Sequence, residues 1–115
     1  MNYIDGFIAS VPADNKQAYI DHCKEAVALF KEYGAIRQVE NWGDDVPDGE
    51  VTDLRKAVLA EEGEVVVFSW IEWSSKEARD EAWKKMMEDP RMKNMTMPFD
   101  GKRMIYGGFQ TLVDE

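Results

Sequence analysis

The sequence is poor in the side chains that form disulfides and zinc sites. Among its 115 residues there is one cysteine, Cys23, and one histidine, His22. A single cysteine excludes an internal disulfide and fits a reducing compartment, so we expect a cytoplasmic protein. The two residues also leave too few ligands for a structural zinc site. We therefore expect no metal and no bound cofactor.

Basic charge and long apolar runs are scarce as well. Fourteen Lys and Arg residues stand against 23 Asp and Glu residues, which gives a net charge of −9. This balance disfavours nucleic acid and anionic membranes, because both bind basic surfaces. No apolar run approaches the roughly 20 residues of a membrane span, and the N-terminus has no signal-peptide pattern. We expect neither nucleic acid nor membrane as a partner.

Strand and helix signals alternate along the whole chain without a linker or repeat, which predicts one domain over residues 1–115. Residues rich in β-branched and aromatic side chains predict strands at 3–11, 35–42, 64–73 and 103–113. Apolar stripes at helical spacing predict helices from about Asp14 to Tyr33 and from Ser74 to about Glu88. The order β-α-β-β-α-β predicts an α+β, ferredoxin-like domain with a four-stranded antiparallel sheet and two helices on one face.

Local signals predict where these helices begin and end. Asp14 and Ser74 each have the spacing of a capping box, and Gly34 is placed to end the first helix. The segment 51–60 is ambiguous, since it could hold a short helical turn at 52–55 or an extended piece at 57–60. Residues 91–99 are expected to form a methionine-rich loop.

The predicted strand 64–73 is apolar on both of its faces. Val65, Val67 and Ile71 alternate with Val66, Phe68 and Trp70, which must point the other way. Two helices cover only one face of a four-stranded sheet, so the other face needs a second covering layer. The simplest solution is a homodimer that packs sheet against sheet. The alternative is a monomer with a few exposed apolar residues.

Charged residues on the predicted strands are the first candidates for a site. A buried charge is costly unless it is paired. These residues therefore pair with one another, lie at strand ends, or line a polar pocket, where an arginine and a carboxylate would bind a small polar or anionic ligand. The residues concerned are Asp5, Arg37, Glu40, Glu72 and Arg103.

Three further features allow either a functional or a structural interpretation. His22 is either a general base facing a cavity or a histidine on a helix flank. The tryptophans and Tyr106 either wall an aromatic pocket or anchor the core. Six of the seven methionines lie between residues 86 and 104, where they either bind Cu(I) or fill space flexibly. The candidate pocket residues are His22, Arg37, Trp42, Trp70, Glu72, Arg103 and Tyr106.

Several segments together carry a resemblance that spans essentially the whole chain. These are residues 3–7, 43–49, 67–71, 89–92 and, most specific of all, 97–109. In this order they resemble the small bacterial YbaA-like proteins, a family defined as a domain of unknown function. The resemblance implies the dimeric α+β barrel superfamily, and hence a homodimer.

That superfamily includes cofactor-free monooxygenases, muconolactone isomerases, haem-binding chlorite dismutases and stress-induced binding proteins. It therefore implies a fold and an assembly but no reaction, and no catalytic residues carry over. We expect a protein that binds a small molecule between sheet and helices. The alternatives are a cofactor-independent monooxygenase or isomerase, and a structural or protein-interaction module without a ligand.

Overall fold

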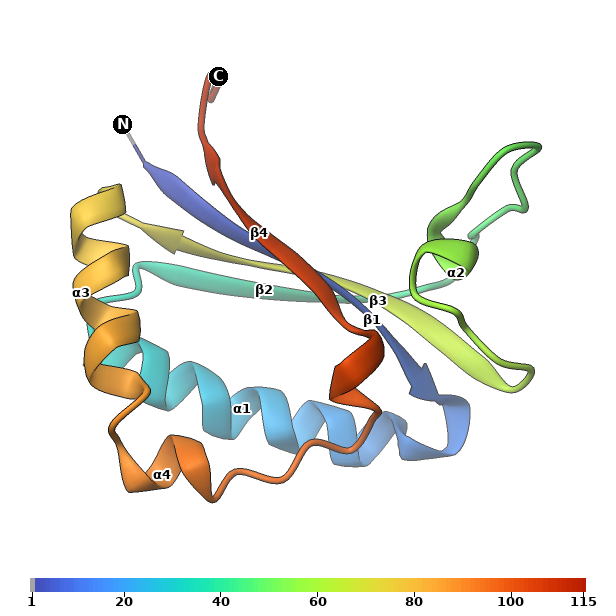
Figure 1. Cartoon of the computed structure of the whole chain (residues 1–115), viewed down its shortest axis with the longest axis horizontal. Coiled ribbons are helices and arrows are strands. Elements are labelled where there is room, and N and C mark those ends of the chain that lie inside the picture. Colours follow the sequence, from blue (N-terminus) through green and yellow to red (C-terminus); the bar gives the residue numbers. More distant parts are fainter. Residues whose placement is uncertain (1) are drawn as a thin grey trace.

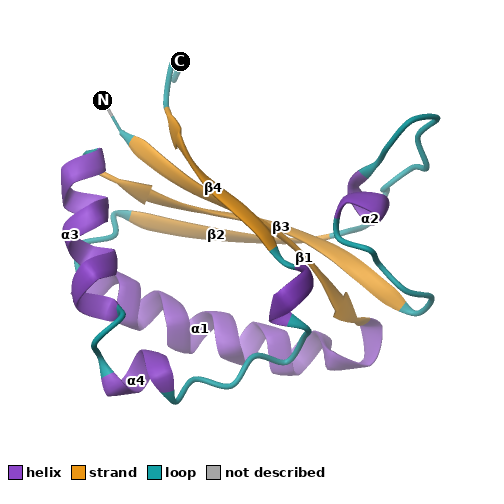
Figure 2. Ribbon diagram, in the orientation of Figure 1, coloured by secondary structure: helices purple, strands orange, loops and turns teal. Residues whose placement is uncertain are grey.

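The computed structural model describes residues 2–115 and contains one four-stranded antiparallel sheet with helices gathered on one side (Figures 1 and 2). The strand order is β2-β3-β1-β4. The central strands β1 and β3 are ten residues long and pair with a neighbouring strand along both edges. The predicted α+β class is confirmed. The strands are β1 (Tyr3–Pro12), β2 (Arg37–Trp42), β3 (Glu64–Trp73) and β4 (Ile105–Gln110).

Two long helices and a short one lie on the same side of the sheet. In Figure 1, α1 (Lys16–Glu32) runs beneath the strands, α3 (Lys76–Met86) stands at one end, and α4 (Pro90–Lys93) lies beside α1. The short helix α2 (Leu54–Ala57) belongs to the connection between β2 and β3, which lies at the end of the sheet opposite α3, on the side of the strands away from α1. Two single turns, η1 (Ala13–Asn15) and η2 (Gly101–Arg103), precede α1 and β4.

The predicted capping residues of both helices are wrong by one position. The first helix begins at Lys16 after Asn15, and no side chain caps it. Asn15 instead donates its side-chain amide to the carbonyl oxygen of Pro98 at 2.9 Å, so a tertiary contact replaces the local cap. In α3 the cap is Ser75, whose backbone is extended and whose hydroxyl accepts from the amide of Ala78 at 3.0 Å. Gly34 does follow α1 with a φ of 111°, as predicted.

The connecting segments and strand ends differ from prediction in three places and decide one open alternative. Pro90 begins α4 rather than a loop, because proline fits the first turn of a helix and the Asp89 carboxylate caps it. The segment 51–60 takes the helical alternative at Leu54–Ala57, capped by Asp53. The last strand begins at Ile105 instead of residue 103, because η2 closes a turn first, and β2 begins at Arg37 instead of residue 35.

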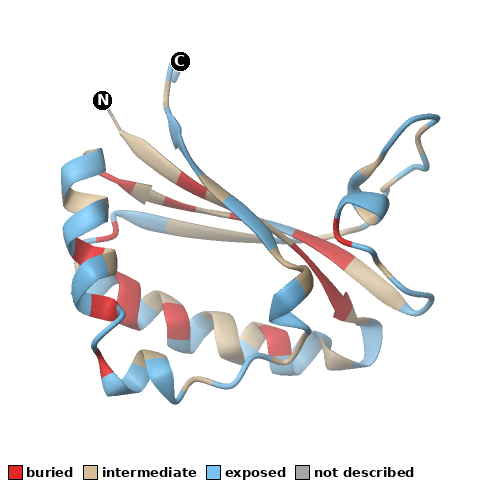
Figure 3. Cartoon of the chain, viewed as in Figure 1, coloured by how far each residue is buried: buried red, intermediate tan, exposed pale blue. Residues whose placement is uncertain are grey.

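The core lies mainly between the sheet and the helices, and Figure 3 shows buried residues in both layers, on β1 and β3 and on α1 and α3. Register pairs such as Tyr3 with Trp73 and Ala9 with Val67 direct alternate side chains to this side. The buried residues form two separate clusters. One contains Ala26, Phe30, Ala35, Ile71, Trp73, Ala82 and Met86, and the other contains Ala9, Val11, Tyr19 and Val67.

The opposite side of the sheet, the open face, has neither α1, α3 nor α4 over it; the connection with α2 lies at one end of it, where Ser10 and Val66 are buried. It carries the side chains of Ile4, Ile8, Phe68, Trp70, Ile105 and Phe109. Phe68 is 49% exposed and Phe109 59%. Gly6 and Gly107 face each other in register, and the Phe109 ring covers both positions. Both sides of β3 are therefore apolar, and on the open face the chain leaves the part around Phe68 uncovered.

Candidate functional site

A cavity of about 680 Å³ lies between the sheet and the helices. Its walls include members of both core clusters, such as Ala9 and Ile71, so it separates the two clusters. Most of the lining is apolar, and the exposed Met87 and Tyr106 mark its rim. A largely apolar cavity with a few polar groups is typical of small-molecule sites in proteins.

One wall of the cavity is the segment of residues 87–104, here called the methionine segment. Five of its methionines line the cavity, namely Met87, Met92, Met95, Met97 and Met104, as does Phe99. Thioether side chains are flexible and polarisable, so they adapt to guests of irregular shape. This arrangement supports the space-filling interpretation of the methionines.

The end of the methionine segment that is nearer α3 is tied to α1 by charge. Arg91 pairs with Asp89 at 2.8 Å and with Glu32 at 2.7 Å. The Tyr33 hydroxyl also donates to Asp89 at 2.6 Å. Hydrogen bonds from Arg91 and then from Tyr33 hold the pKa of Asp89 well below its usual range.

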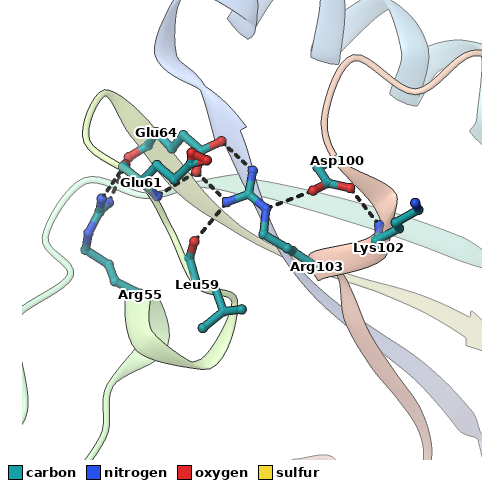
Figure 4. A network of polar contacts seen from close by, with 7 residues as sticks. All are labelled: Arg55, Leu59, Glu61, Glu64, Asp100, Lys102 and Arg103. Carbon is teal, nitrogen blue, oxygen red and sulfur yellow. Dashed lines mark hydrogen bonds and ion pairs between the residues drawn. The ribbon is translucent and has the colours of Figure 1, made fainter.

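The other end of this segment is tied to β3 by Arg103 (Figure 4). Its guanidinium meets both oxygens of Glu64, at 2.7 and 2.8 Å, and Asp100 at 3.1 Å. It also donates to the carbonyl oxygen of Leu59 at 2.9 Å. The hydrogen bonds from Arg103 lower the pKa of Glu64 to about 2. Arg103 is therefore fully engaged in these ties and does not line the cavity.

Asp5 is a buried carboxylate on β1 whose partners all come from β3 and α3. It accepts from the indole nitrogens of Trp73 and Trp83 at 2.9 and 2.8 Å, and from Arg79 at 2.7 Å. Arg79 also pairs with Asp80 at 2.9 Å. With its oxygens occupied, Asp5 fastens α3 to the sheet and leaves no acceptor for a ligand.

Glu40 provides the polar end of the cavity. The Tyr19 hydroxyl donates to its Oε1 at 2.5 Å, and the Gln38 side-chain amide donates to its Oε2 at 2.7 Å. Among residues 2–115, no cation lies within 4.0 Å of this carboxylate. Burial, followed by the charge of Glu40, raises the pKa of Tyr19 and raises that of Cys23 to about 12. Cys23 is thus a thiol at neutral pH, not a nucleophile.

His22 lies beside this polar end and lines the cavity. Its ring meets Phe99 edge to face at 6.2 Å between centroids, and its Nδ1 has no hydrogen-bond partner within the described chain. Burial lowers the pKa of His22, against smaller opposing effects of Glu25 and Glu40, so the ring is neutral at pH 7. Across residues 2–115, no three His, Cys, Asp or Glu side chains come together as metal ligands.

The remaining predicted residues are divided between the two sides of the sheet. Tyr106 lines the cavity rim, whereas Trp42 lies in a neighbouring groove with Lys16 over its ring at 5.5 Å. Trp70 lies on the open face, where Glu72 accepts from its indole at 3.3 Å and pairs with Arg37 at 3.8 Å. The structure thus gathers His22 and Tyr106 around the cavity and leaves the other five outside its lining.

Two important cavity residues were not among the sequence candidates. Tyr19 was assigned to the apolar stripe of the first helix, and its hydroxyl gave no separate signal. Gln38 is a neutral residue on a strand of mixed polarity, so nothing distinguished it. Glu40 did stand out, as a charge on a predicted strand.

A family model described as "Protein of unknown function (DUF1428)" matches residues 2–101. The chain belongs to this family. It is 63% identical over 117 residues to the uncharacterised protein YbaA of Escherichia coli K12, with 100% of both chains covered. The YbaA protein of Shigella flexneri matches with the same identity and coverage. The predicted membership of the YbaA-like family is thus confirmed. No helix within residues 2–115 is both long and apolar enough to cross a membrane.

Proposed function

We propose that the protein is a cytoplasmic homodimer that binds a small molecule between its sheet and its helices. The cavity of about 680 Å³ carries this proposal, because its walls are apolar and its polar groups converge at one end around Glu40. The strand order β2-β3-β1-β4, with helices on one side, supports a ferredoxin-like arrangement.

The open face supports the second half of the proposal, a dimeric α+β barrel. Its aromatic residues Phe68 and Phe109 are about half exposed, which is costly for a patch of this character in a monomer. A twofold partner that packs sheet on sheet would cover them. Light scattering at micromolar concentration tests this assembly. We expect twice the chain mass of 13.2 kDa, and a mass near 13.2 kDa would contradict it.

A metabolite thermal-shift screen tests the ligand proposal. We expect a subset of compounds to raise the melting temperature of the wild type by more than that of Met95→Trp, whose larger indole would occupy part of the cavity. The matched control is Lys93→Trp, because Lys93 is exposed on α4 and does not line the cavity. A screen without hits, or hits that bind Met95→Trp equally well, would favour a structural or protein-interaction module instead.

A cofactor-independent isomerase is the second candidate, favoured by one observation. Glu40 and the neutral His22 both line the cavity, within reach of a guest that has an acidic C–H bond. A carboxylate could remove a proton from carbon and return it at a neighbouring position. Incubating each screening hit with the protein in D₂O tests this. Deuterium uptake that is lost in Glu40→Gln supports an isomerase, and its absence leaves a binding protein.

A further inference from the structure

The cationic side chains that line the cavity are either paired with carboxylates or exposed at its rim. Arg79 lines it, but its guanidinium is held by Asp5 at 2.7 Å and by Asp80 at 2.9 Å. Lys84 also lines the cavity and is exposed, so it belongs to the rim. Three carboxylates and two cationic side chains line the cavity, so the net charge of its lining is negative.

The Glu40 carboxylate keeps acceptor capacity at the polar end of the cavity. Each oxygen of Glu40 accepts from one neutral group and keeps a free lone pair. The Gln38 Oε1 is buried without a partner within residues 2–115, as is the His22 Nδ1. The Gln38 amide nitrogen donates to Glu40, which fixes the orientation of the side chain and identifies the unpartnered atom as the oxygen, an acceptor. What this end of the cavity lacks is a donor, since buried acceptors are normally satisfied.

We propose that the cavity selects apolar molecules whose polar end donates hydrogen bonds, with a protonated primary amine preferred over a hydroxyl and both preferred over a carboxylate. This selectivity rests on the proposed function. An ammonium group brings three donors and the charge that Glu40 lacks. An anion would meet the negative charge of Glu40 within a largely apolar lining.

Two features of the rest of the molecule point the same way. The net charge of −9 attracts cations and repels anions before contact. The methionine segment offers thioethers to an aliphatic or aromatic body.

Three probes with one body and different heads test this selectivity: 4-phenylbutylamine, 4-phenylbutan-1-ol and 4-phenylbutyrate. Each is titrated at pH 7 into the full chain, and binding is followed by calorimetry and by shifts in protein NMR spectra. We expect the amine to bind at least about tenfold more tightly than the carboxylate. Glu40→Gln should abolish this preference. Glu62→Gln is the control, because it removes the same charge from an exposed site away from the cavity.

The possible outcomes distinguish the proposed selectivity from the proposed binding of a small molecule. If the carboxylate binds as tightly as the amine, or if Glu40→Gln retains the preference, the selectivity is wrong and the binding function stands. If none of the three probes binds at millimolar concentration, both are overturned. Gln38→Met is a second variant in case Glu40→Gln does not fold. It removes the unpartnered Oε1, and we expect severalfold weaker binding of amine and alcohol with the carboxylate unaffected.

Discussion

The Tyr19 hydroxyl donates a hydrogen bond of 2.5 Å to Glu40 and thereby joins α1 to the edge strand β2. Tyr19 is only 7% exposed, and its ring also meets the edge of Phe99 at 5.8 Å between centroids. One side chain thus connects a helix, a strand and the methionine segment at the polar end of the cavity.

Removing this hydroxyl should destabilise the protein. In Tyr19→Phe a Glu40 oxygen loses its donor, and we expect the free energy of unfolding to fall by about 1–3 kcal/mol. Urea denaturation measures the change. Tyr106→Phe is the control, because Tyr106 is 74% exposed and should change by less than about 0.5 kcal/mol. Equal effects in the two variants would contradict a stabilising role for the Tyr19 hydroxyl.

Asp5 should be the most sensitive carboxylate in the chain. Replacing it with Asn removes the charge that faces Arg79 and disturbs the indole hydrogen bonds of Trp73 and Trp83. We expect a loss of about 3–5 kcal/mol, because a partly buried guanidinium keeps only its pair with the exposed Asp80. Asp80→Asn removes the other partner of Arg79 but from the surface, and should cost less than about 1 kcal/mol. Thermal or urea unfolding would show the contrast.

Glu64 should make stability depend on pH. Arg103 lowers its pKa from 4.5 to about 2 in the folded state. The stabilisation is therefore present above pH 4.5 and is lost as the pH falls towards 2, because the unfolded chain binds the proton first. Near neutral pH, Glu64→Gln should lower the free energy of unfolding by about 2 kcal/mol. Urea titrations between neutral pH and pH 3 should show this difference shrinking only below pH 4.5.

A charge on the open face should separate the proposed dimer. Phe68→Asp places a carboxylate at the centre of this face, where desolvation in a dimer would be costly. We expect light scattering to give the chain mass of 13.2 kDa for this variant. Val51→Asp is the control, because Val51 is 93% exposed on the connection between β2 and β3. If Phe68→Asp kept the wild-type mass, the sheet faces would not form the interface.

His22 should titrate below its ordinary pKa of 6.5, because burial disfavours its charged form. As the only histidine in the chain, it gives one set of ring signals in an NMR pH titration. Phe99→Ala exposes the ring and should raise the pKa towards 6.5. A wild-type pKa at or above 6.5 would contradict the buried position.

The sheet was predictable from sequence because its central strand is apolar on both faces. The predicted span 64–73 coincides with β3, since a long β-branched and aromatic run leaves little ambiguity. The ends of helices were less predictable. Asn15 donates to Pro98, 83 positions away, and no local pattern shows that this contact replaces a cap.

The sequence identifies the charged residues on the strands, but it does not show which of them remain without a partner in the fold. Arg37 and Glu72 pair because strand register brings them opposite each other. Asp5 finds its partner Arg79 on a helix 74 positions away, which no spacing rule anticipates. Only after these pairs are assigned does Glu40 stand alone in the cavity.

The methionine segment behaves mechanically as a span clamped at both ends. Its end anchors are the ion pairs of Arg91 and Arg103, and the Asn15 amide also holds the carbonyl oxygen of Pro98; the thioethers of Met92, Met95 and Met97 lie between the two arginines. Stiffness therefore resides in these ties and compliance in the stretch around Met95. A guest larger than the cavity would bow this middle outwards before it moved α1 or the sheet, so the wall sets a soft upper limit on ligand size.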